Sequence, residues 1–312
     1  MKLSICTDVY ADLTYTEMLD KVKSLGIDAV EMTAGGWGAR KHVNTAELLS
    51  DEKRLQDFKH ELEQRGMSIA ALNTSCNQLW PSETGKMYSE SMYDCVLLAE
   101  KLSVKKIVCM AGLPAGSAND TTPNWIVSTV SWPDFMMPAY EYQWRVTISW
   151  WKDFVGHCKA HGIERIAIEE FPGTMVYNVE TMLKLRNEVD PMIGINLDPS
   201  HMIALGSDPI VSVRALKDCI YHVHGKDIRI ERGIVEKNGL FEPKSVTDTA
   251  ERSWNYVAVG CGQDLKWWKE FFSVLSMVGY DDYVSLEMED LTMSVDAGIS
   301  TSIEALEMSI SR

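Results

Sequence analysis

Short apolar runs rich in valine and isoleucine alternate along the whole chain with longer amphipathic stretches. Runs of this kind are typical of buried β-strands, and apolar residues three or four positions apart are typical of helices that pack on a sheet. The pattern predicts strands over 2–7, 28–32, 68–73, 106–110, 165–169, 193–197, 220–224 and 283–287. It predicts helices over 14–25, 51–65, 88–102, 141–161, 178–188, 209–217, 264–278 and 298–309.

One local sequence recurs where a predicted helix ends and the next strand begins: a glycine followed by an apolar residue. It is found at Leu25-Gly26-Ile27, Arg65-Gly66-Met67, His161-Gly162-Ile163 and Val278-Gly279-Tyr280. Glycine just beyond a helix favours its termination, and Thr14 is typical of an N-cap. The repetition indicates one βα unit used again and again. Eight such units predict an α/β protein, a (β/α)8 TIM barrel.

The whole chain, residues 1–312, is expected to form a single domain, because no linker rich in Pro, Gly or Ser divides it. A doubly wound sheet is less favoured, since no Gly-x-Gly-x-x-Gly motif follows the first strand. Two connections are too long for plain loops, 111–140 after the fourth strand and 228–263 after the seventh. Both belong to the C-terminal face of a barrel, so we expect lids or partner surfaces there; the alternative is a packed excursion with no direct role.

The charge balance narrows the classes of partner. The chain carries 30 Lys+Arg and 45 Asp+Glu, a net charge of −15, which argues against binding to nucleic acid or to an anionic membrane. No apolar stretch reaches the roughly 18 residues of a membrane span, and the first residues lack a secretory signal pattern. The seven cysteines form no CxxC pair. We therefore expect a cytoplasmic protein with reduced thiols rather than disulfides or a zinc cage.

Candidate chemistry gathers at the ends of the last four predicted strands. These strands end in IAIEE, INLDPSH, YHVHGKD and SLEMED. Because the carboxyl ends of barrel strands converge at one mouth, Glu169, Asp198, His224 and Glu287 are expected to form one cluster. Each residue alone is more often a helix cap, an ion-pair partner or a core histidine. Four successive strand ends favour a joint role.

Three converging carboxylates repel one another unless a cation lies between them. Carboxylate-rich ligation with one imidazole and no thiolate suits Mn²⁺, with Mg²⁺ or Co²⁺ as alternatives, better than structural Zn²⁺. The sequence therefore predicts one divalent metal, manganese being the preferred ion. His201, three residues after Asp198, is expected to orient a ligand or to donate to substrate; the alternative is a helix cap.

Softer candidates accompany this cluster. Lys226 is expected either to face the substrate or to pair with Asp227. His222 should lie one layer below His224, and Glu31 should face the mouth from the second strand. Trp37, His42, Asn77 and Trp80 are candidate substrate-binding residues, because amides match hydroxyl groups and aromatic faces stack on sugar rings. The alternative for these four is ordinary loop packing.

Several motifs together resemble one family over nearly the whole chain. They are GIDAVEM (26–32), LNTSCNQLWP (72–81), IAIEEFPG (166–173), INLDPSHM (195–202), YHVHGKD (221–227), WNYVAVGCGQDLKWW (254–268) and GYDDYVSLEMED (279–290). The chain resembles the sugar phosphate isomerase/epimerase, or xylose-isomerase-like TIM-barrel, superfamily. That resemblance implies that Glu169, Asp198, His224 and Glu287 bind one divalent metal, and that His201 supports the metal or the substrate.

The resemblance also implies a reaction. In the ketose 3-epimerase branch the two metal-binding glutamates shuttle the substrate proton, a role implied here for Glu169 and Glu287. Many members read Glu-Asn-His-Pro-Gly after the fifth strand, whereas this chain reads Glu169-Glu170-Phe171-Pro172-Gly173. The chain is similar to enzymes that act on inososes and 3-oxo-glycosides, a branch that includes the large subunit of C-glycoside deglycosidases, which works with a small second subunit.

The leading hypothesis is a metal-dependent enzyme that removes a proton next to the carbonyl of a keto-sugar or related polyol. Return of the proton gives an isomerase or epimerase. Expulsion of a β-substituent instead gives a lyase, such as a deglycosidase with a partner subunit. A non-catalytic sugar-binding subunit is a further alternative, and a homo-oligomer or a hetero-oligomer is expected. Phosphoester hydrolysis on DNA is disfavoured by the charge, and an unphosphorylated substrate is favoured because no phosphate cradle is evident.

Overall fold

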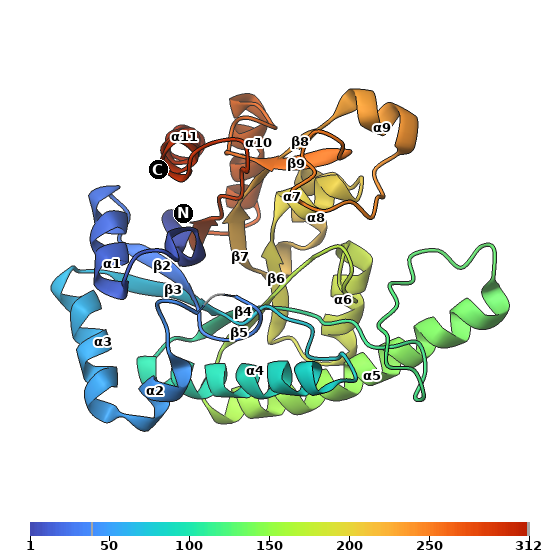
Figure 1. The fold of residues 1–312 in the computed structure, drawn as a ribbon, viewed down its shortest axis with the longest axis horizontal. Coiled ribbons are helices and arrows are strands. Elements are labelled where there is room, and N and C mark those ends of the chain that lie inside the picture. Colours follow the sequence, from blue (N-terminus) through green and yellow to red (C-terminus); the bar gives the residue numbers. More distant parts are fainter. Residues whose placement is uncertain (39, 311–312) are drawn as a thin grey trace.

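Eight parallel strands form a closed barrel in this computed structural model, which describes residues 1–38 and 40–310 (Figure 1). The strands follow one another around the barrel in the order β1-β10-β7-β6-β5-β4-β3-β2. Their bounds are β1 Lys2–Cys6, β2 Ala29–Thr33, β3 Ser68–Asn73, β4 Lys106–Met110, β5 Arg165–Glu169, β6 Ile193–Leu197, β7 Ile220–Gly225 and β10 Tyr283–Leu286. The last strand closes the ring on the first, with Lys2 opposite Tyr283 and Ile5 opposite Leu286. The predicted single-domain (β/α)8 barrel is confirmed.

Helices surround the barrel between successive strands. They are α1 Tyr15–Ser24, α2 Thr45–Ser50, α3 Glu52–Gln64, α4 Glu83–Leu102, α5 Pro133–Ala160, α6 Val179–Glu188, α7 Pro199–Ala204, α8 Pro209–Ala215, α9 Arg232–Asn238, α10 Leu265–Met277 and α11 Val295–Ser309. The expected cap of α1 is confirmed, since Thr14 and Glu17 form a reciprocal capping box. The described residues contain no helix long and apolar enough to cross a bilayer.

The recurring helix-to-strand glycines share one backbone conformation. Gly26, Gly66, Gly162 and Gly279 all have a positive φ, between 62° and 89°. A residue with a β-carbon is strained there, so glycine ends each helix and turns the chain toward the next strand. The recurring glycine motif in the sequence therefore marks the same helix-to-strand turn at four places in the barrel.

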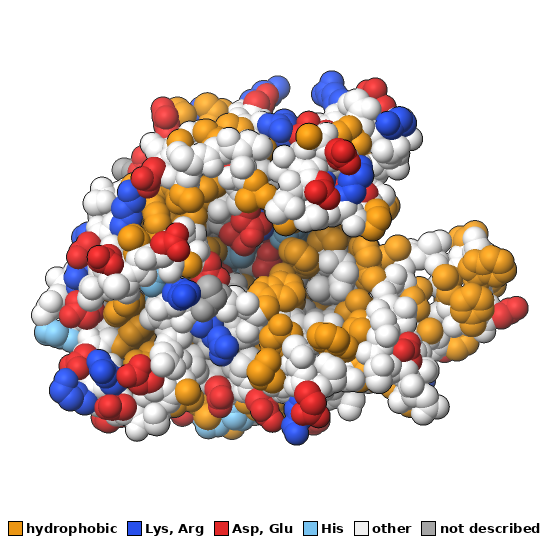
Figure 2. All heavy atoms as spheres, viewed as in Figure 1, with side chains coloured by type: hydrophobic (Ala, Val, Ile, Leu, Met, Phe, Trp, Pro, Cys, Tyr) orange, Lys and Arg blue, Asp and Glu red, His pale blue; other side chains and the backbone are white. Residues whose placement is uncertain are grey.

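Helix α5 begins earlier than the periodicity predicts, and this changes the long connection after β4. Pro133 is its first residue, where a missing N–H costs no hydrogen bond, so residues 133–140 are helical rather than loop. The start of α5 and the preceding loop project from the barrel (Figure 1). Figure 2 shows hydrophobic side chains gathered on this projection. Val130 is 88% exposed, Trp132 59% and Phe135 61%.

The long connection after β7 also has structure of its own. Strand β8 (Asp227–Ile230) pairs antiparallel with β9 (Trp254–Val257), with Asp227 opposite Val257. Helix α9 lies between them in sequence. The Asp227 carboxylate accepts hydrogen bonds from the backbone N–H groups of Gly260, Gly262 and Gln263, which anchors the end of this excursion to the barrel.

The outer face of the barrel strands is apolar, whereas the inner face carries polar side chains together with the small apolar cluster of Ala71, Val108 and Ala167. The core between strands and helices contains Ile5, Val30, Leu72, Ile168, Ile195, Val223 and Leu286, each at most 1% exposed. The interior contains a hydrogen-bonded polar column instead. Ser4 Oγ lies 2.7 Å from Ser285 Oγ, which lies 2.8 Å from His222 Nε2. Such a column is stable only when its members are paired, so it restricts the interior to one arrangement.

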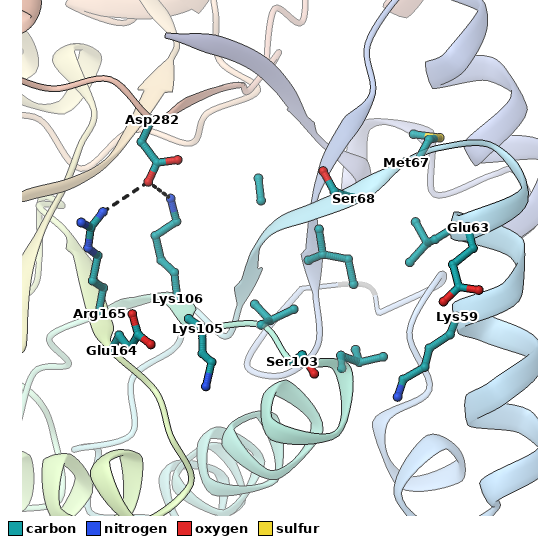
Figure 3. A pocket seen from close by; sticks show the side chains of 15 residues that line it. Lys59, Glu63, Met67, Ser68, Ser103, Lys105, Lys106, Glu164, Arg165 and Asp282 are labelled. Atoms are coloured by element: carbon teal, nitrogen blue, oxygen red, sulfur yellow. Dashed lines mark hydrogen bonds and ion pairs between the residues drawn. The ribbon is translucent and has the colours of Figure 1, made fainter.

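A cavity of about 600 Å³ opens at the N-terminal end of the barrel (Figure 3). Three of its charged groups are paired with one another: Asp282 Oδ2 lies 3.0 Å from Lys106 Nζ and 3.4 Å from Arg165 Nη1. Lys106 is 6% exposed, so its ammonium depends on this carboxylate. Because barrel enzymes place their chemistry at the opposite end, we interpret this cluster as structural.

Replacement of Asp282 by asparagine tests this interpretation. Asparagine can still accept the hydrogen bond that Asp282 Oδ1 receives from the Tyr283 N–H, but it leaves Lys106 buried without a counter-charge. We expect a loss of about 2 kcal/mol in the free energy of unfolding at pH 7, measured by urea denaturation.

The pH dependence has a definite sign. Burial alone would raise the pKa of Asp282, but Lys106 outweighs it and holds this pKa below its usual value. The stabilisation should therefore be complete above about pH 4 and should disappear as acid protonates the folded carboxyl. The neighbouring Asp281→Asn is the control, because that side chain is 85% exposed and its pair should contribute little. Equal losses for both variants would contradict the interpretation.

Candidate metal centre

Four side chains from successive strand ends meet at the C-terminal mouth of the barrel. Glu169 ends β5, Asp198 follows β6, His224 lies in β7 and Glu287 follows β10. One ligand-type atom of each lies within 4.8 Å of the others. His224 Nδ1 is 2.9 Å from Glu287 Oε2, 3.5 Å from Asp198 Oδ2 and 3.7 Å from Glu169 Oε1. The structure thus brings together the four residues that the strand ends single out; their role as ligands stays a prediction.

The cluster has the chemistry of a site for a hard divalent cation. Asp198 Oδ2, His224 Nδ1 and Glu287 Oε2 are buried and have no hydrogen-bond partner among the described residues. Buried polar atoms without partners are costly, and three of them aimed at one point fit a shared ligand. Three carboxylates and one imidazole are donors that Mn²⁺ and similar ions accept. The residues present therefore fit one divalent metal.

Hydrogen bonds to the backbone orient Asp198, and contacts of its second ring nitrogen orient His224. Asp198 caps α7 through Oδ1, which leaves Oδ2 free, and its N–H donates to Glu170 Oε1 at 3.0 Å. His224 Nε2 faces away from the cluster, 3.3 Å from Glu31 Oε2 and 3.0 Å from Asn196 Nδ2. A carboxylate behind a ligating imidazole sets its tautomer and orientation.

Glu31 connects this centre to the polar column below it. Its carboxylate also lies 2.8 Å from His222 Nε2 and accepts from Asn73 Nδ2 at 2.8 Å. Burial alone would raise the pKa of Glu31, but His224 and His222 outweigh it and hold this pKa well below its usual value. Burial lowers the pKa of His222 to about 4. The expected position of His222, one layer below His224, agrees with the structure.

His201 lies against the cluster with both nitrogens engaged. Nε2 is 3.0 Å from Glu169 Oε1, and Nδ1 is 3.1 Å from the Tyr256 hydroxyl. The Phe171 ring packs edge-on against the imidazole, at 4.4 Å between centroids. His201 can therefore hold Glu169 in place, as the orienting role predicts, while Tyr256 and Phe171 restrain the ring.

Lys226 pairs with the glutamates of β10 rather than with its sequence neighbour. Its Nζ lies 2.6 Å from Glu289 Oε2 and 3.3 Å from Glu287 Oε1, and 4.3 Å from the centroid of the Tyr256 ring. Asp227 instead binds the backbone of residues 260–263, so the alternative of a local Lys226–Asp227 pair is wrong. Burial would raise the pKa of Glu287, but Lys226 and His224 outweigh it and lower it to about 2.

A pocket of about 520 Å³ opens directly over this centre. Figure 2 shows the hollow, with carboxylate and imidazole side chains at its base and hydrophobic side chains beside it. Glu169 and Glu287 line the pocket, whereas Asp198 and His224, at most 1% exposed, lie beneath its surface. The two glutamates are thus the cluster members that a bound molecule could touch.

The predicted substrate-binding residues separate into two groups. Trp37 and Lys226 line the pocket. His42, Asn77 and Trp80 are not among its described lining residues, which corrects their expected placement. His42 Nε2 lies near the Tyr10 and Leu13 carbonyls. Asn77 is clamped to the backbone of Leu113, and Trp80 Nε1 donates to the Thr121 carbonyl. Polar loop residues here hold loops together.

The two long connections also differ in their relation to the pocket. Val246 and Thr247, from the excursion after β7, line it, which agrees with a covering role for that excursion. Residues 111–140 contribute no lining residue in the described chain, so the expected lid is not found there. Trp125 from this loop packs against Tyr177, at 5.4 Å between centroids, and near Phe241.

Sequence reasoning missed several residues around the centre. Tyr256 lies within the family motif 254–268, but that motif assigns it no role; it reaches His201 because β9 pairs with β8, which packs against α7. Phe171 was noted only as a departure from a family motif, yet it forms part of the pocket wall. Cys6, at the end of β1, lies 3.9 Å from His224 Nε2. The alternation of β1 could have identified Cys6, since position 6 shares its face with Ser4. All seven cysteines lie within the described residues and are free thiols.

Comparisons with known proteins agree with this architecture. The uncharacterized protein YfiH of Bacillus subtilis (strain 168) is 52% identical over 313 residues, which cover 100% of both chains. The solved structure of the probable 3-DHS dehydratase AsbF from Bacillus anthracis is similar with a TM-score of 0.69 and 19% identity, over 98% of this chain and 97% of that one. The IolI protein, solved with a bound zinc atom, has a TM-score of 0.68 and 18% identity over 100% of both chains.

A D-psicose 3-epimerase from Clostridium cellulolyticum H10 is similar in the same way, with a TM-score of 0.63 and 15% identity over 99% of this chain and 98% of that one. At such identities the solved structures establish the fold alone. The family profile is more specific and matches residues 19–308. The chain belongs to the xylose isomerase-like TIM barrel family.

Proposed function

We propose that this protein is a divalent-metal-dependent enzyme of the sugar isomerase/epimerase type, acting next to the carbonyl of a keto-sugar or related polyol. One observation carries the proposal. Glu169 and Glu287 belong to one cluster that fits a cation, and both open onto the same pocket, whereas Asp198 and His224 are fully buried. A molecule in the pocket would therefore meet two carboxylates beside the proposed metal position.

Each residue then has a chemical task. A divalent ion held by Glu169, Asp198, His224 and Glu287, manganese being preferred, would supply Lewis-acid polarisation of the substrate carbonyl. One of Glu169 and Glu287, as a carboxylate, removes the proton on the neighbouring carbon, and the other, as a carboxylic acid, returns its own proton to that carbon. His201 holds Glu169, and Lys226 holds Glu287, so that both carboxylates keep their positions across the pocket. Return of the proton on the opposite face gives an epimer.

Elimination is the second candidate reaction. If the electrons left on the α-carbon expel a β-substituent, the same residues perform lyase chemistry, as in a C-glycoside deglycosidase acting on a 3-oxo-glycoside. One observation favours this candidate: a 3-dehydroshikimate dehydratase of Bacillus anthracis is 34% identical to this chain, over 82 residues that cover 26% of this chain and 28% of that one. Dehydration is an elimination. The two candidate reactions, epimerisation and elimination, would use the same base and differ in the fate of the intermediate.

A partner chain also remains a prediction. The projecting apolar side chains Val130, Trp132 and Phe135 support a binding surface for a second chain, in a homo-oligomer or with a small second subunit. A protein that is monomeric by light scattering and fully active by itself would contradict this prediction of a partner chain.

Metal binding is tested without reference to activity. Saturating Mn²⁺ should raise the melting temperature of the metal-free protein by about 5 °C or more, because a ligand that binds only the folded state stabilises it. Asp198→Asn retains the oxygen that caps α7 but loses a charged donor, so it should weaken Mn²⁺ binding at least about tenfold in calorimetry. Asp12→Asn, at an exposed position, is the control and should bind as the wild type does. Full affinity in Asp198→Asn would remove Asp198 from the ligand set.

Glu31→Gln tests the carboxylate behind His224. It removes the charge that faces His224 Nε2, while the amide can still bond to Asn73 or His222. We expect Mn²⁺ affinity to fall about tenfold, as for other groups that orient a metal ligand. Unchanged affinity would mean that Asn196 alone orients the imidazole.

The reaction is tested by NMR in D₂O with Mn²⁺-loaded protein and a panel of ketoses, inososes and 3-oxo-glycosides. Deuterium on the α-carbon with an epimeric product supports the isomerase, and loss of the aglycone supports the lyase. Glu169→Gln should lower the rate of either reaction by roughly 10²–10⁴-fold. Glu304→Gln, exposed on α11, is the control. A Glu169→Gln variant that binds metal and retains full activity would exclude Glu169 as a catalytic residue.

A further inference from the structure

We infer that the pocket over the metal centre selects an uncharged polyol that carries an apolar substituent, and that it rejects sugar phosphates and carboxylates. The inference rests on the proposed function, since it names the substrate class of the same site. It depends on two features of the lining: an excess of carboxylates without a free cation, and an apolar wall next to the reacting centre.

The lining is strongly acidic. Its described residues include the carboxylates Asp8, Glu31, Glu169, Glu287 and Glu289 and a single ammonium group, that of Lys226. A divalent ion would offset the charges of its own ligands, and Lys226 pairs with Glu289, but Asp8 stands apart from that cluster with the neutral Thr33 hydroxyl as its hydrogen-bond donor. An anionic substrate would therefore enter a field of its own sign.

Lys226 cannot act as an anion receptor in this arrangement. Its Nζ is shared between Glu289 and Glu287, and the residue is 2% exposed. The Tyr256 ring lies 4.3 Å from Nζ and occupies a further side. Capture of a phosphate or carboxylate would require the loss of both ion pairs in a buried place, which is costly. Apart from the proposed metal, the described lining thus has no cationic side chain available for an acidic substrate.

The second feature is an apolar wall, which we define as Trp37, Phe171, Val246, Met288 and Leu291. Phe171 connects the wall to the centre, because its ring packs against His201 on one side and lies 6.3 Å from the Trp37 ring on the other. Trp37 is 53% exposed, Val246 47% and Leu291 55%. Three exposed apolar side chains from three segments of the chain that face one pocket are unusual in the absence of an apolar ligand.

The size of the pocket agrees with both features. A volume of about 520 Å³ lies within the range that accommodates drug-sized molecules, so it holds a sugar ring and a further ring. Hydroxyl groups of the polyol find acceptors and donors at Asp8, Thr33 and Asn73. The apolar substituent then lies against Trp37 and Phe171. The geometry thus divides the pocket into a hydroxyl-binding side and an apolar side.

Calorimetric titration of the full-length Mn²⁺-loaded protein with three unreactive probes tests the inference. The probes are methyl β-D-glucopyranoside, phenyl β-D-glucopyranoside and phenyl β-D-glucuronide. Burial of the phenyl ring should make phenyl glucoside bind about tenfold more tightly than methyl glucoside. The carboxylate should make the glucuronide bind about tenfold more weakly than phenyl glucoside, with a difference that shrinks as salt is added.

Variants assign each preference to its residues. Trp37→Ala and Phe171→Ala should each reduce the ratio of phenyl glucoside affinity to methyl glucoside affinity toward one. Trp132→Ala removes a similarly exposed tryptophan outside the pocket, at 59% exposure, and should preserve the preference. Asp8→Asn should reduce the penalty for the glucuronide severalfold.

The contrary results are equally definite. Equal affinity for the methyl and phenyl glucosides, glucuronide binding as tight as that of phenyl glucoside, or no saturable binding of any probe would each overturn the inference. These measurements involve no turnover, so they are separate from the proposed reaction. A protein that shows the expected binding preferences but exchanges no α-proton in D₂O would refute the proposed reaction and support the inferred substrate class. A protein that catalyses the reaction but lacks these preferences would support the proposed reaction and refute the inferred substrate class.

Discussion

Repulsion among three carboxylates at the mouth of the barrel is the constraint around which the rest of the site is arranged. Glu169, Asp198 and Glu287 meet at His224 within 4.8 Å, in a place with little water to screen them. Such a cluster is stable only if each charge is balanced by a cation or a hydrogen-bond donor. The neighbouring residues provide part of this balance, His201 for Glu169, Lys226 for Glu287, and the start of α7 for one oxygen of Asp198, and leave Asp198 Oδ2 and Glu287 Oε2 without hydrogen-bond partners.

Buried charged and polar groups inside the barrel also require partners. His224 directs one nitrogen to the carboxylates, and its other nitrogen requires Glu31, which in turn requires His222 and Asn73. The interior column of Ser4, Ser285 and His222 continues this network toward the opposite end. At that end, Lys106 and Asp282 form a separate ion pair in which the two charges balance each other. Polar residues thus occupy part of a barrel interior that apolar residues usually fill, beside the small apolar cluster of Ala71, Val108 and Ala167, and their pairing holds the centre in one geometry.

Local pattern predicted the barrel well because each βα unit carries its own signals. Valine- and isoleucine-rich runs mark the strands, and Gly26, Gly66, Gly162 and Gly279 mark the ends of helices with a backbone conformation that other residues avoid. Alternation along strands also placed His222 beneath His224. The start of α5 was not predicted correctly. Periodicity alone places the start of this helix later, and Pro133 and Pro138 made the first residues look like a loop. Proline in a first turn favours a helix, whereas further along it usually argues against one.

By itself, the sequence determined the fold and the grouping of Glu169, Asp198, His224 and Glu287, because strand order and side-chain alternation suffice to bring strand ends together. Tertiary structure decided which other residues reach the pocket. His42, Asn77 and Trp80 have the chemistry of a sugar site but bind loop backbone, whereas Phe171 and Tyr256 adjoin His201 although their sequence motifs indicate no such contact. The physical reason is that excursions after the strands follow no short period. Their side chains take positions set by contacts between segments distant in sequence, such as Tyr256 of β9 with His201 of α7.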